Sequence, residues 1–330
     1  MDIHVSNCYF DILVSKSPYL RNELERYRLL ENCTVHCKAG YVTSLMGDAK
    51  TTLCLLKLIS LRSQDGIMAG DIHHDNVIRK QGHFTDIAYV TTFNSHYFDH
   101  LSVSDYLRWA AQLRLSLSLI ECQAVAMEVA GLVNIEPTSQ VKDLSRGERI
   151  LLSLASELVS SPTLLCLERP LEGLEEHEAI NVLNALRRIA KRPNYFTTVV
   201  FTCSGLSADM LPLVHCLHVF HQRSIVYSID THLASSRCCS KLTQLSRLLM
   251  TLESPICDAC QVRDRIIDVL SELQAAPSPD YSASLVLPPR GRHLPPSHIL
   301  RITKPLFEEV QLLLMRALSC ITSNVWVSSY

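Results

Sequence analysis

Short apolar runs rich in β-branched residues alternate with segments of helical spacing, and this alternation most constrains the fold. The runs at 87–90 (IAYV), 164–167 (LLCL) and 197–202 (TTVVFT) predict buried strands. Helical spacing marks five segments: 50–62, 104–115, 120–132, 148–159 and 175–190. Strands that alternate with helices indicate an α/β domain with a mostly parallel sheet. Residues 218–227 predict a terminal hairpin.

Composition and charge narrow the class of protein. The 31 Lys and Arg against 33 Asp and Glu give a formal charge of −2. Because binding to nucleic acid through a basic face needs a clear cationic excess, we expect no nucleic-acid partner. The chain has no uninterrupted apolar run of about 18 residues and no N-terminal signal pattern. With 13 cysteines, an odd number, we expect a cytoplasmic protein with mostly free thiols.

Changes in composition divide the chain into five predicted parts. They are an N-terminal segment (1–28), an α/β domain (29–230), its C-terminal extension (231–274), a Pro-rich linker (275–303) and a final amphipathic helix (304–330). The linker carries repeated prolines, as in APSPD and LPPRGRHLPP.

A candidate phosphate site follows Gly47, between a predicted strand and a predicted helix. Lys50, Thr51 and Thr52 begin that helix, where backbone N–H groups and the helix dipole attract an anion. In the full G-x-x-x-x-G-K-[ST] pattern the lysine neutralises phosphate charge and the hydroxyl ligates Mg²⁺. Two residues separate Gly47 from Lys50 where the pattern has five, and the second glycine is missing. An ordinary capped helix start is the alternative interpretation.

Two further motifs follow in a fixed order. The first is 144–148 (LSRGE), and the second is 165–175 (LCLERPLEGLE), which begins seventeen positions after Glu148. Together with the Gly47 segment they resemble the nucleotide-binding domain of ABC transporters, most closely the G subfamily of lipid and sterol half-transporters. The resemblance covers about 29–270 and 304–324. Single motifs are weak signals, and their collinear order is a strong one.

The resemblance implies an ABC-type ATPase domain that binds ATP and Mg²⁺. Its fold would be α/β, with a RecA-like mixed sheet core, a small antiparallel β region and an inserted α-helical subdomain at about 101–159. The positions that would hold the nucleotide are Gly47, Lys50, Thr51, Thr52 and Glu168, with Mg²⁺ held through Thr51. Residues 304–330 would be the connecting helix toward a membrane domain that is absent from this chain.

The same resemblance implies damage to the chain's own ATP site. The metal-holding Asp is Glu168, the catalytic Glu is Arg169, and the switch His is Ser204. The Q-loop Gln falls at Thr91 or Thr92. Catalytic acid–base groups contribute typically ~10²–10⁴-fold each. The resemblance therefore implies weakened ATP binding and lost hydrolysis, with no catalytic residue left at these positions.

Residues that in this family act on a partner's ATP are better kept. They are Ser145, Gly147, Glu148 and the Gly173-Leu174 turn. Within the same motif Arg146 replaces one glycine of the family pattern. The resemblance thus implies a partner that is another ABC half-transporter or nucleotide-binding domain. A heterodimer is favoured over a homodimer, at the cytoplasmic face of a membrane. The alternative is a soluble regulatory or scaffold protein whose nucleotide site no longer functions.

Two weaker signals concern metals. Cys257 and Cys260, with Cys238 and Cys239 upstream, have zinc-like spacing, but no second C-x-x-C is present, so free thiols are favoured. Four histidines are predicted to lie in polar loops: His73, His74, His96 and His100. In such loops we expect solvated side chains and not metal ligands. We therefore expect no resident metal besides the Mg²⁺ of a nucleotide.

Overall fold

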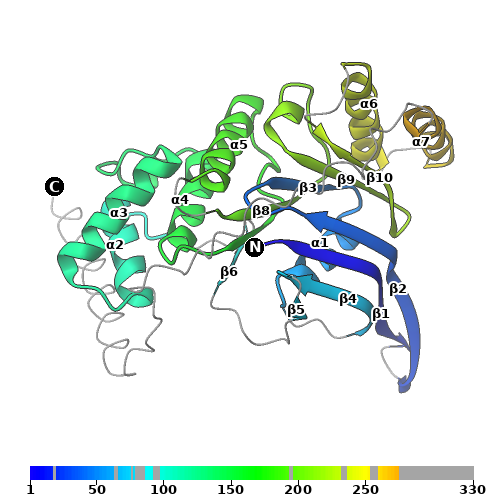
Figure 1. Ribbon diagram of the computed structural model, residues 1–330, viewed down its shortest axis with the longest axis horizontal. Coiled ribbons are helices and arrows are strands. Elements are labelled where there is room, and N and C mark those ends of the chain that lie inside the picture. Colours follow the sequence, from blue (N-terminus) through cyan, green and yellow to red (C-terminus); the bar gives the residue numbers. More distant parts are fainter. Residues whose placement is uncertain are drawn as a thin grey trace.

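The structure is a computed structural model, and Figure 1 shows its arrangement of two sheets with helices around them. It describes residues 1–17, 20–62, 66–75, 77–78, 86–91, 97–192, 196–231, 236–252 and 259–274. The predicted linker (275–303) and final helix (304–330) lie outside the described residues.

The central sheet has six strands in the order β10-β9-β3-β8-β7-β6. The strands are β3 (Val42–Met46), β6 (Ile87–Thr91), β7 (Leu164–Glu168), β8 (Thr198–Cys203), β9 (Cys216–His221) and β10 (Ser224–Asp230). The ladders that join β6, β7, β8, β3 and β9 are parallel, and β10 is antiparallel to β9. Burial on both faces explains their continuous apolar runs. The predicted strands and the terminal hairpin are confirmed.

A second sheet is antiparallel, in the order β2-β1-β4-β5. Its strands are β1 (Ile3–Ser17), β2 (Leu20–Cys37), β4 (Ile67–His74) and β5 (Val77–Ile78). Helix α1 (Ala49–Ile59) shares one buried apolar cluster with this sheet and with residues of the central sheet. Residues 1–28, which the sequence set apart as an N-terminal segment, therefore supply β1 and the first part of β2.

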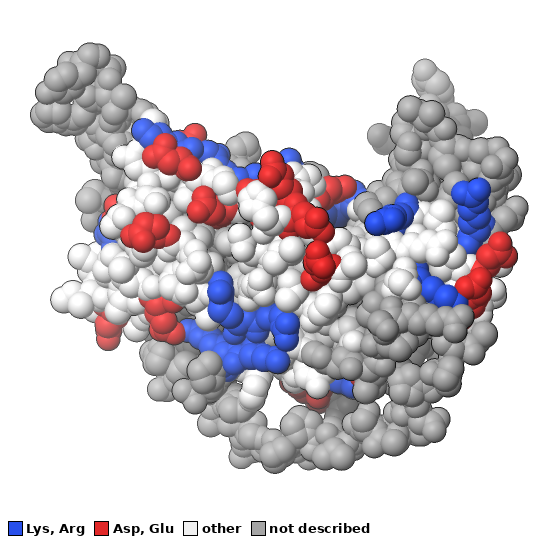
Figure 2. Space-filling model, turned by 90° about the horizontal axis from the view of Figure 1, so that it is seen from above, with Lys and Arg blue, Asp and Glu red and all other residues white. Residues whose placement is uncertain are grey.

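The remaining helices lie at the two ends of the molecule (Figure 1). At one end are α2 (Val103–Arg114), α3 (Leu119–Val133), α4 (Arg146–Leu158) and α5 (Glu176–Ala190); at the other are α6 (Ser236–Leu252) and α7 (Ala259–Gln274). The expected helical subdomain at about 101–159 corresponds to α2, α3 and α4. None of the helices in the described ranges combines the length and apolar character needed to cross a bilayer. Figure 2 shows basic and acidic side chains in separate small groups on the face seen from above.

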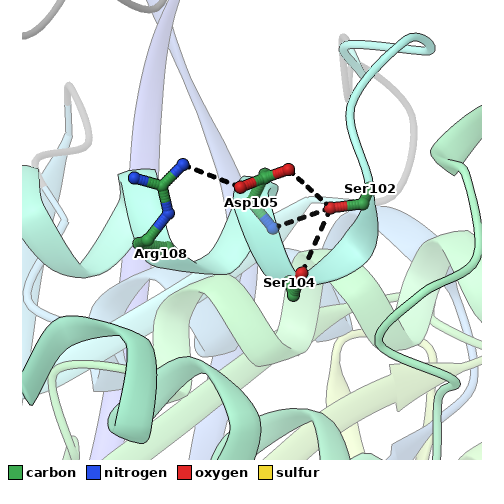
Figure 3. A network of polar contacts seen from close by, with 4 residues as sticks. All are labelled: Ser102, Ser104, Asp105 and Arg108. Atoms are coloured by element: carbon green, nitrogen blue, oxygen red, sulfur yellow. Dashed lines mark hydrogen bonds and ion pairs between the residues drawn. The ribbon is translucent and has the colours of Figure 1, made fainter. Parts of the chain in front are cut away.

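Polar contacts fix where the helical subdomain begins. Ser102 caps α2: its Oγ accepts the Asp105 N–H at 3.1 Å and donates to Asp105 Oδ2 at 2.7 Å (Figure 3). Arg108 Nη2 donates to Asp105 Oδ1 at 2.7 Å. Partial burial opposes ionisation of Asp105, but the hydrogen bonds from Ser102 and Arg108 outweigh it and lower the carboxyl pKa. The cap thus keeps a charged acid in the first turn, where the helix dipole favours it.

Candidate functional site

Parallel pairing brings the predicted nucleotide positions to one edge of the central sheet. Met46 of β3 lies opposite Cys203 of β8, and Thr91 of β6 lies opposite Glu168 of β7. The chain segments that leave these strands therefore begin side by side, at the edge where open α/β sheets bind ligands. Thr92, the alternative Q-loop position, lies outside the described residues.

The turn between β3 and α1 is too tight to form a wide loop. Only Gly47 and Asp48 separate Met46 from Ala49. Gly47 has φ +140°, and its N–H donates to the Cys203 carbonyl at 3.2 Å. A Cβ at position 47 would lie 2.4 Å from the Phe220 carbonyl oxygen. Glycine is therefore required for a turn that closes directly onto β8 and β9.

A carboxylate occupies the N-terminus of α1. Asp48 is the N-cap, and its Oδ2 accepts hydrogen bonds from the Thr51 N–H at 3.1 Å and from Thr51 Oγ1 at 3.0 Å. Thr52 Oγ1 donates to the Asp48 carbonyl at 2.9 Å. Both hydroxyls are buried within this cap, whereas the Lys50 side chain is exposed. Of the groups expected to bind phosphate and Mg²⁺, Thr51 thus binds the carboxylate of an aspartate of the same chain through its N–H and its hydroxyl.

The end of β7 carries an ion pair formed by Arg169, which the sequence already placed at the catalytic-Glu position. Arg169 has φ +47°, and its N–H donates to Thr202 Oγ1 at 3.0 Å. Its guanidinium pairs with Glu172, at 3.2 Å between Nη1 and Oε1. Glu168 Oε2 accepts from the Tyr89 hydroxyl at 3.2 Å. Burial, with the Glu168 charge beside it, raises the pKa of Tyr89, which stays a neutral donor. Ser204 follows β8 and is half-buried.

The second predicted motif forms the start of α4. Ser145 is the N-cap in a capping box with Glu148: Glu148 N–H donates to Ser145 Oγ at 3.3 Å, and Ser145 N–H donates to Glu148 Oε2 at 2.8 Å. The side chains of Ser145 and Glu148 are exposed, and so is that of Arg146. The Arg146 guanidinium lies against Gly173, where a Cβ would come within 2.7 Å of Nη1.

A second carboxylate reaches the N-terminus of α4 from another helix. The Gly147 N–H donates to Oε1 of Glu178, which lies in α5, at 3.2 Å. A hydrogen bond to Ser145 holds the pKa of Glu178 below its usual value, and the Gly147 bond acts in the same direction. Glu178 therefore carries a negative charge at the point where the motif would meet an anion.

The sequence did not identify either carboxylate as part of the site. Asp48 stands three residues before Thr51 at the start of a helix, so the usual N-cap pattern could have found it. Glu178 lies 31 residues after Gly147, and only the packing of α5 against α4 brings them together. No local pattern predicts that contact.

The cysteine and histidine signals have mixed outcomes. The described free cysteines are all buried: Cys8, Cys33, Cys37, Cys54, Cys122, Cys166, Cys203 and Cys216. The side chains of Cys238, Cys239, Cys257 and Cys260 lie outside the described residues, as does His96. The interpretation of His73 and His74 as loop residues is wrong, because both lie in β4. Their spacing lacks helical periodicity because they lie in a strand.

Comparison with known sequences finds relatives in one group of transporters. No family model matches the chain. ABC transporter G family member 24 of Dictyostelium discoideum is 28% identical over 241 residues, which are 69% of this chain. ABC transporter G family member 42 of Arabidopsis thaliana is 30% identical over 200 residues, or 56% of this chain. The match spans only 20% and 14% of the lengths of these curated relatives.

Comparison with solved structures gives the fold. A dimeric ATP-binding cassette in a post-hydrolysis state, bound to ADP and Pi, aligns with a TM-score of 0.53 at 15% identity, covering 69% of this chain and 98% of that one. An ATP-binding cassette of an ABC transporter in its ADP conformation aligns with a TM-score of 0.56 at 13% identity, covering 80% and 99%. The chain therefore has the fold of an ABC ATPase nucleotide-binding domain.

Proposed function

We propose that this chain, a homologue of ABC transporter G family nucleotide-binding domains, serves as a nucleotide-binding-domain half of such a transporter without hydrolysing ATP in its own site. The sequence relatives and the fold support the transporter part. From the resemblance to lipid and sterol half-transporters, we propose that the transporter exports a lipid or a sterol. The partner would be a second half with a working ATP site, at the cytoplasmic face of a membrane.

One observation carries the loss of function in the chain's own site: the Asp48 carboxylate caps the helix that would bind the β-phosphate. Asp48 is exposed, so two like charges about 4 Å apart there repel by between roughly 1 kcal/mol, as in bulk water, and roughly 4 kcal/mol, as at an effective dielectric constant of 20. Arg169, paired with Glu172, supplies a cation where a proton acceptor is needed. As arranged, these residues do not fit magnesium-bound ATP.

The Asp48 cap is tested by nucleotide binding to the purified chain. We expect the wild-type chain to bind MgATP with a Kd above about 1 mM, and Asp48→Asn to bind at least tenfold more tightly because the repelling charge is gone. Isothermal titration calorimetry measures both. The matched control is Asp75→Asn, an exposed acid beyond β4, which should behave as the wild type. Micromolar MgATP binding by the wild-type chain would contradict the proposal.

A second experiment tests whether the chain acts on a partner's nucleotide. Exposure of Ser145 and Arg146 supports this role, because both are accessible to a docked partner. A phosphate of the partner's nucleotide would replace Glu178 at the Gly147 N–H, and the partly exposed Glu178 side chain can turn away to allow this. We expect the chain to raise the ATPase rate of a hydrolysis-competent G family nucleotide-binding domain, and Ser145→Ala to reduce that increase at least tenfold. Ser271→Ala, an exposed serine of α7, is the control. If Ser145→Ala stimulates as well as the wild type, the action on the partner's site is wrong, and a non-catalytic regulatory role is favoured.

A further inference from the structure

We propose that the outer face of the antiparallel sheet binds a divalent transition-metal ion through His4 and one of two flanking histidines, His36 and His73. The proposal is independent of the nucleotide site. It rests on the register of three neighbouring strands. His4 of β1 lies directly opposite His36 of β2 on one side and directly opposite His73 of β4 on the other.

The burial pattern places the three imidazoles on one face. Along β1, Ile3 and Val5 are fully buried and point into the apolar cluster over α1, whereas His4 between them is exposed. Side chains alternate between the two faces of a strand, so His4 points outward. His36 and His73 are its cross-strand partners and are half-buried. The three histidines thus form a row across the outer face, which we name the histidine row.

Distances within the row suit two-histidine binding. The ring centroids of His4 and His36 are 5.7 Å apart, with the ring planes at 73°. Directly opposite residues of antiparallel strands have Cβ atoms about 4.5–5.5 Å apart, so His73 is similarly close on the other side. Among the described residues, no group of three or more His, Cys, Asp or Glu side chains is placed to hold a metal ion. The ion would therefore be held by two imidazoles, with water in the remaining positions.

The chemistry of the row favours a borderline metal. Neutral imidazole is the usual nitrogen ligand of zinc, copper and nickel ions. Nδ1 of His73 is buried and has no hydrogen-bond partner within the described residues. Buried polar atoms are normally paired, so this nitrogen has an unused lone pair or proton. A metal at the row, with the ring turned about its side-chain bonds, would use it.

Cross-strand packing of aromatic rings is the competing explanation for the row. Such pairs contribute roughly 0.2–1 kcal/mol to a sheet. If the row serves only aromatic packing, the purified protein should not bind metal ions at this face, and replacing His4 should change only the stability of the protein. Metal binding predicts a ligand-dependent effect that follows His4, because His4 belongs to both possible pairs.

The test is a calorimetric titration of the full, tag-free chain with Ni²⁺ and, separately, with Zn²⁺ at pH 7.5, which measures the affinity and the number of sites. We expect one saturable site on the wild type and at least a tenfold loss of affinity in His4→Asn. The single variants His36→Asn and His73→Asn should each lose less, because the other pair remains, while the double variant should match His4→Asn. Unfolding midpoints of each variant without metal show that the fold persists.

A control variant and a change of pH check that the histidine row is what binds the metal. His177→Asn replaces an exposed histidine of α5, whose side chain is 70% accessible, and should bind as the wild type. Binding should weaken at pH 5, where imidazoles take up protons before they can act as ligands. Equal affinity in His4→Asn and the wild type, as expected if cysteines bind the ion, would overturn the proposal. So would the lack of any saturable binding below 1 mM.

Discussion

Gly47→Ala is expected to lower the free energy of unfolding by about 3 kcal/mol or more. The added Cβ would lie 2.4 Å from the Phe220 carbonyl oxygen and 3.0 Å from the Phe220 Cβ. Phe220 is fully buried in β9, so its backbone has no room to move away. The residue would also have to keep φ +140°, a conformation that L-residues rarely adopt. Strain and overlap therefore act at the same turn, which joins the central sheet to α1.

The matched control for Gly47→Ala is Gly131→Ala. Gly131 lies in α3, and a Cβ there would meet no atom within 4 Å. Alanine in a helix is favoured over glycine by roughly 0.5–1 kcal/mol, so this variant should gain stability. Urea denaturation of both variants measures the difference. A Gly47→Ala loss below 1 kcal/mol would show that the turn can relax, which contradicts its tight closure onto β9.

The central sheet could be predicted from the sequence because its signal is local. Residues 164–167 and 197–202 are continuous apolar runs, and strands buried on both faces need little else to be recognised. The antiparallel sheet was harder to predict. Its long first strand passes through irregularities between Val5 and Phe10, and each shift interrupts the simple alternation that marks a strand. Residues 1–28 accordingly gave no clear pattern.

The candidate site could be predicted only in part for a similar reason. The resemblance located the positions at the carboxyl edge of the sheet, since motif order follows strand order. The partners of those positions lie partly within the motifs and partly in another helix. Glu178 reaches Gly147 through helix packing, and Glu172 reaches Arg169 across a turn. Whether a phosphate position is open or already capped depends on these contacts; the N-cap pattern could have shown the one at Asp48, but no local pattern shows the one at Glu178.

The two carboxylates give one physical picture of the site. A helix N-terminus has a partial positive charge and unsatisfied N–H groups, so it favours binding of a nearby anion, whether a side-chain carboxylate or a phosphate. In α1 that anion is Asp48, and in α4 it is Glu178. Each acid is tethered to the fold and needs no association from solution, which favours it over a free ligand. Both helix starts therefore have a carboxylate of the chain itself at their N–H groups.

The chain is also expected to lose stability as the pH falls from 7 to 5, chiefly through His218. Burial lowers the pKa of His218 to about 4, against the ordinary value of 6.5 for a solvent-exposed histidine in the unfolded chain. Between these two values the unfolded chain takes up a proton that the folded chain does not. The free energy of unfolding therefore falls with pH through this window, by about 2 kcal/mol between pH 7 and pH 5. Burial also lowers the pKa of His36, which adds a change of the same sign.

Urea unfolding at pH 7, 6 and 5 measures this loss, and His218→Gln isolates its source. Glutamine keeps a polar group near Ser228, whose Oγ lies 2.8 Å from His218 Nδ1, but it does not titrate. We expect this variant to lose most of the pH dependence, whatever its stability at pH 7. Asp11, Asp105, Asp230 and Glu178 all have lowered pKa values, so their contributions are lost only at more acidic pH and leave this window to the histidines. An unchanged slope in His218→Gln would show that His218 takes up its proton equally in the folded and the unfolded chain, so that burial does not shift its pKa.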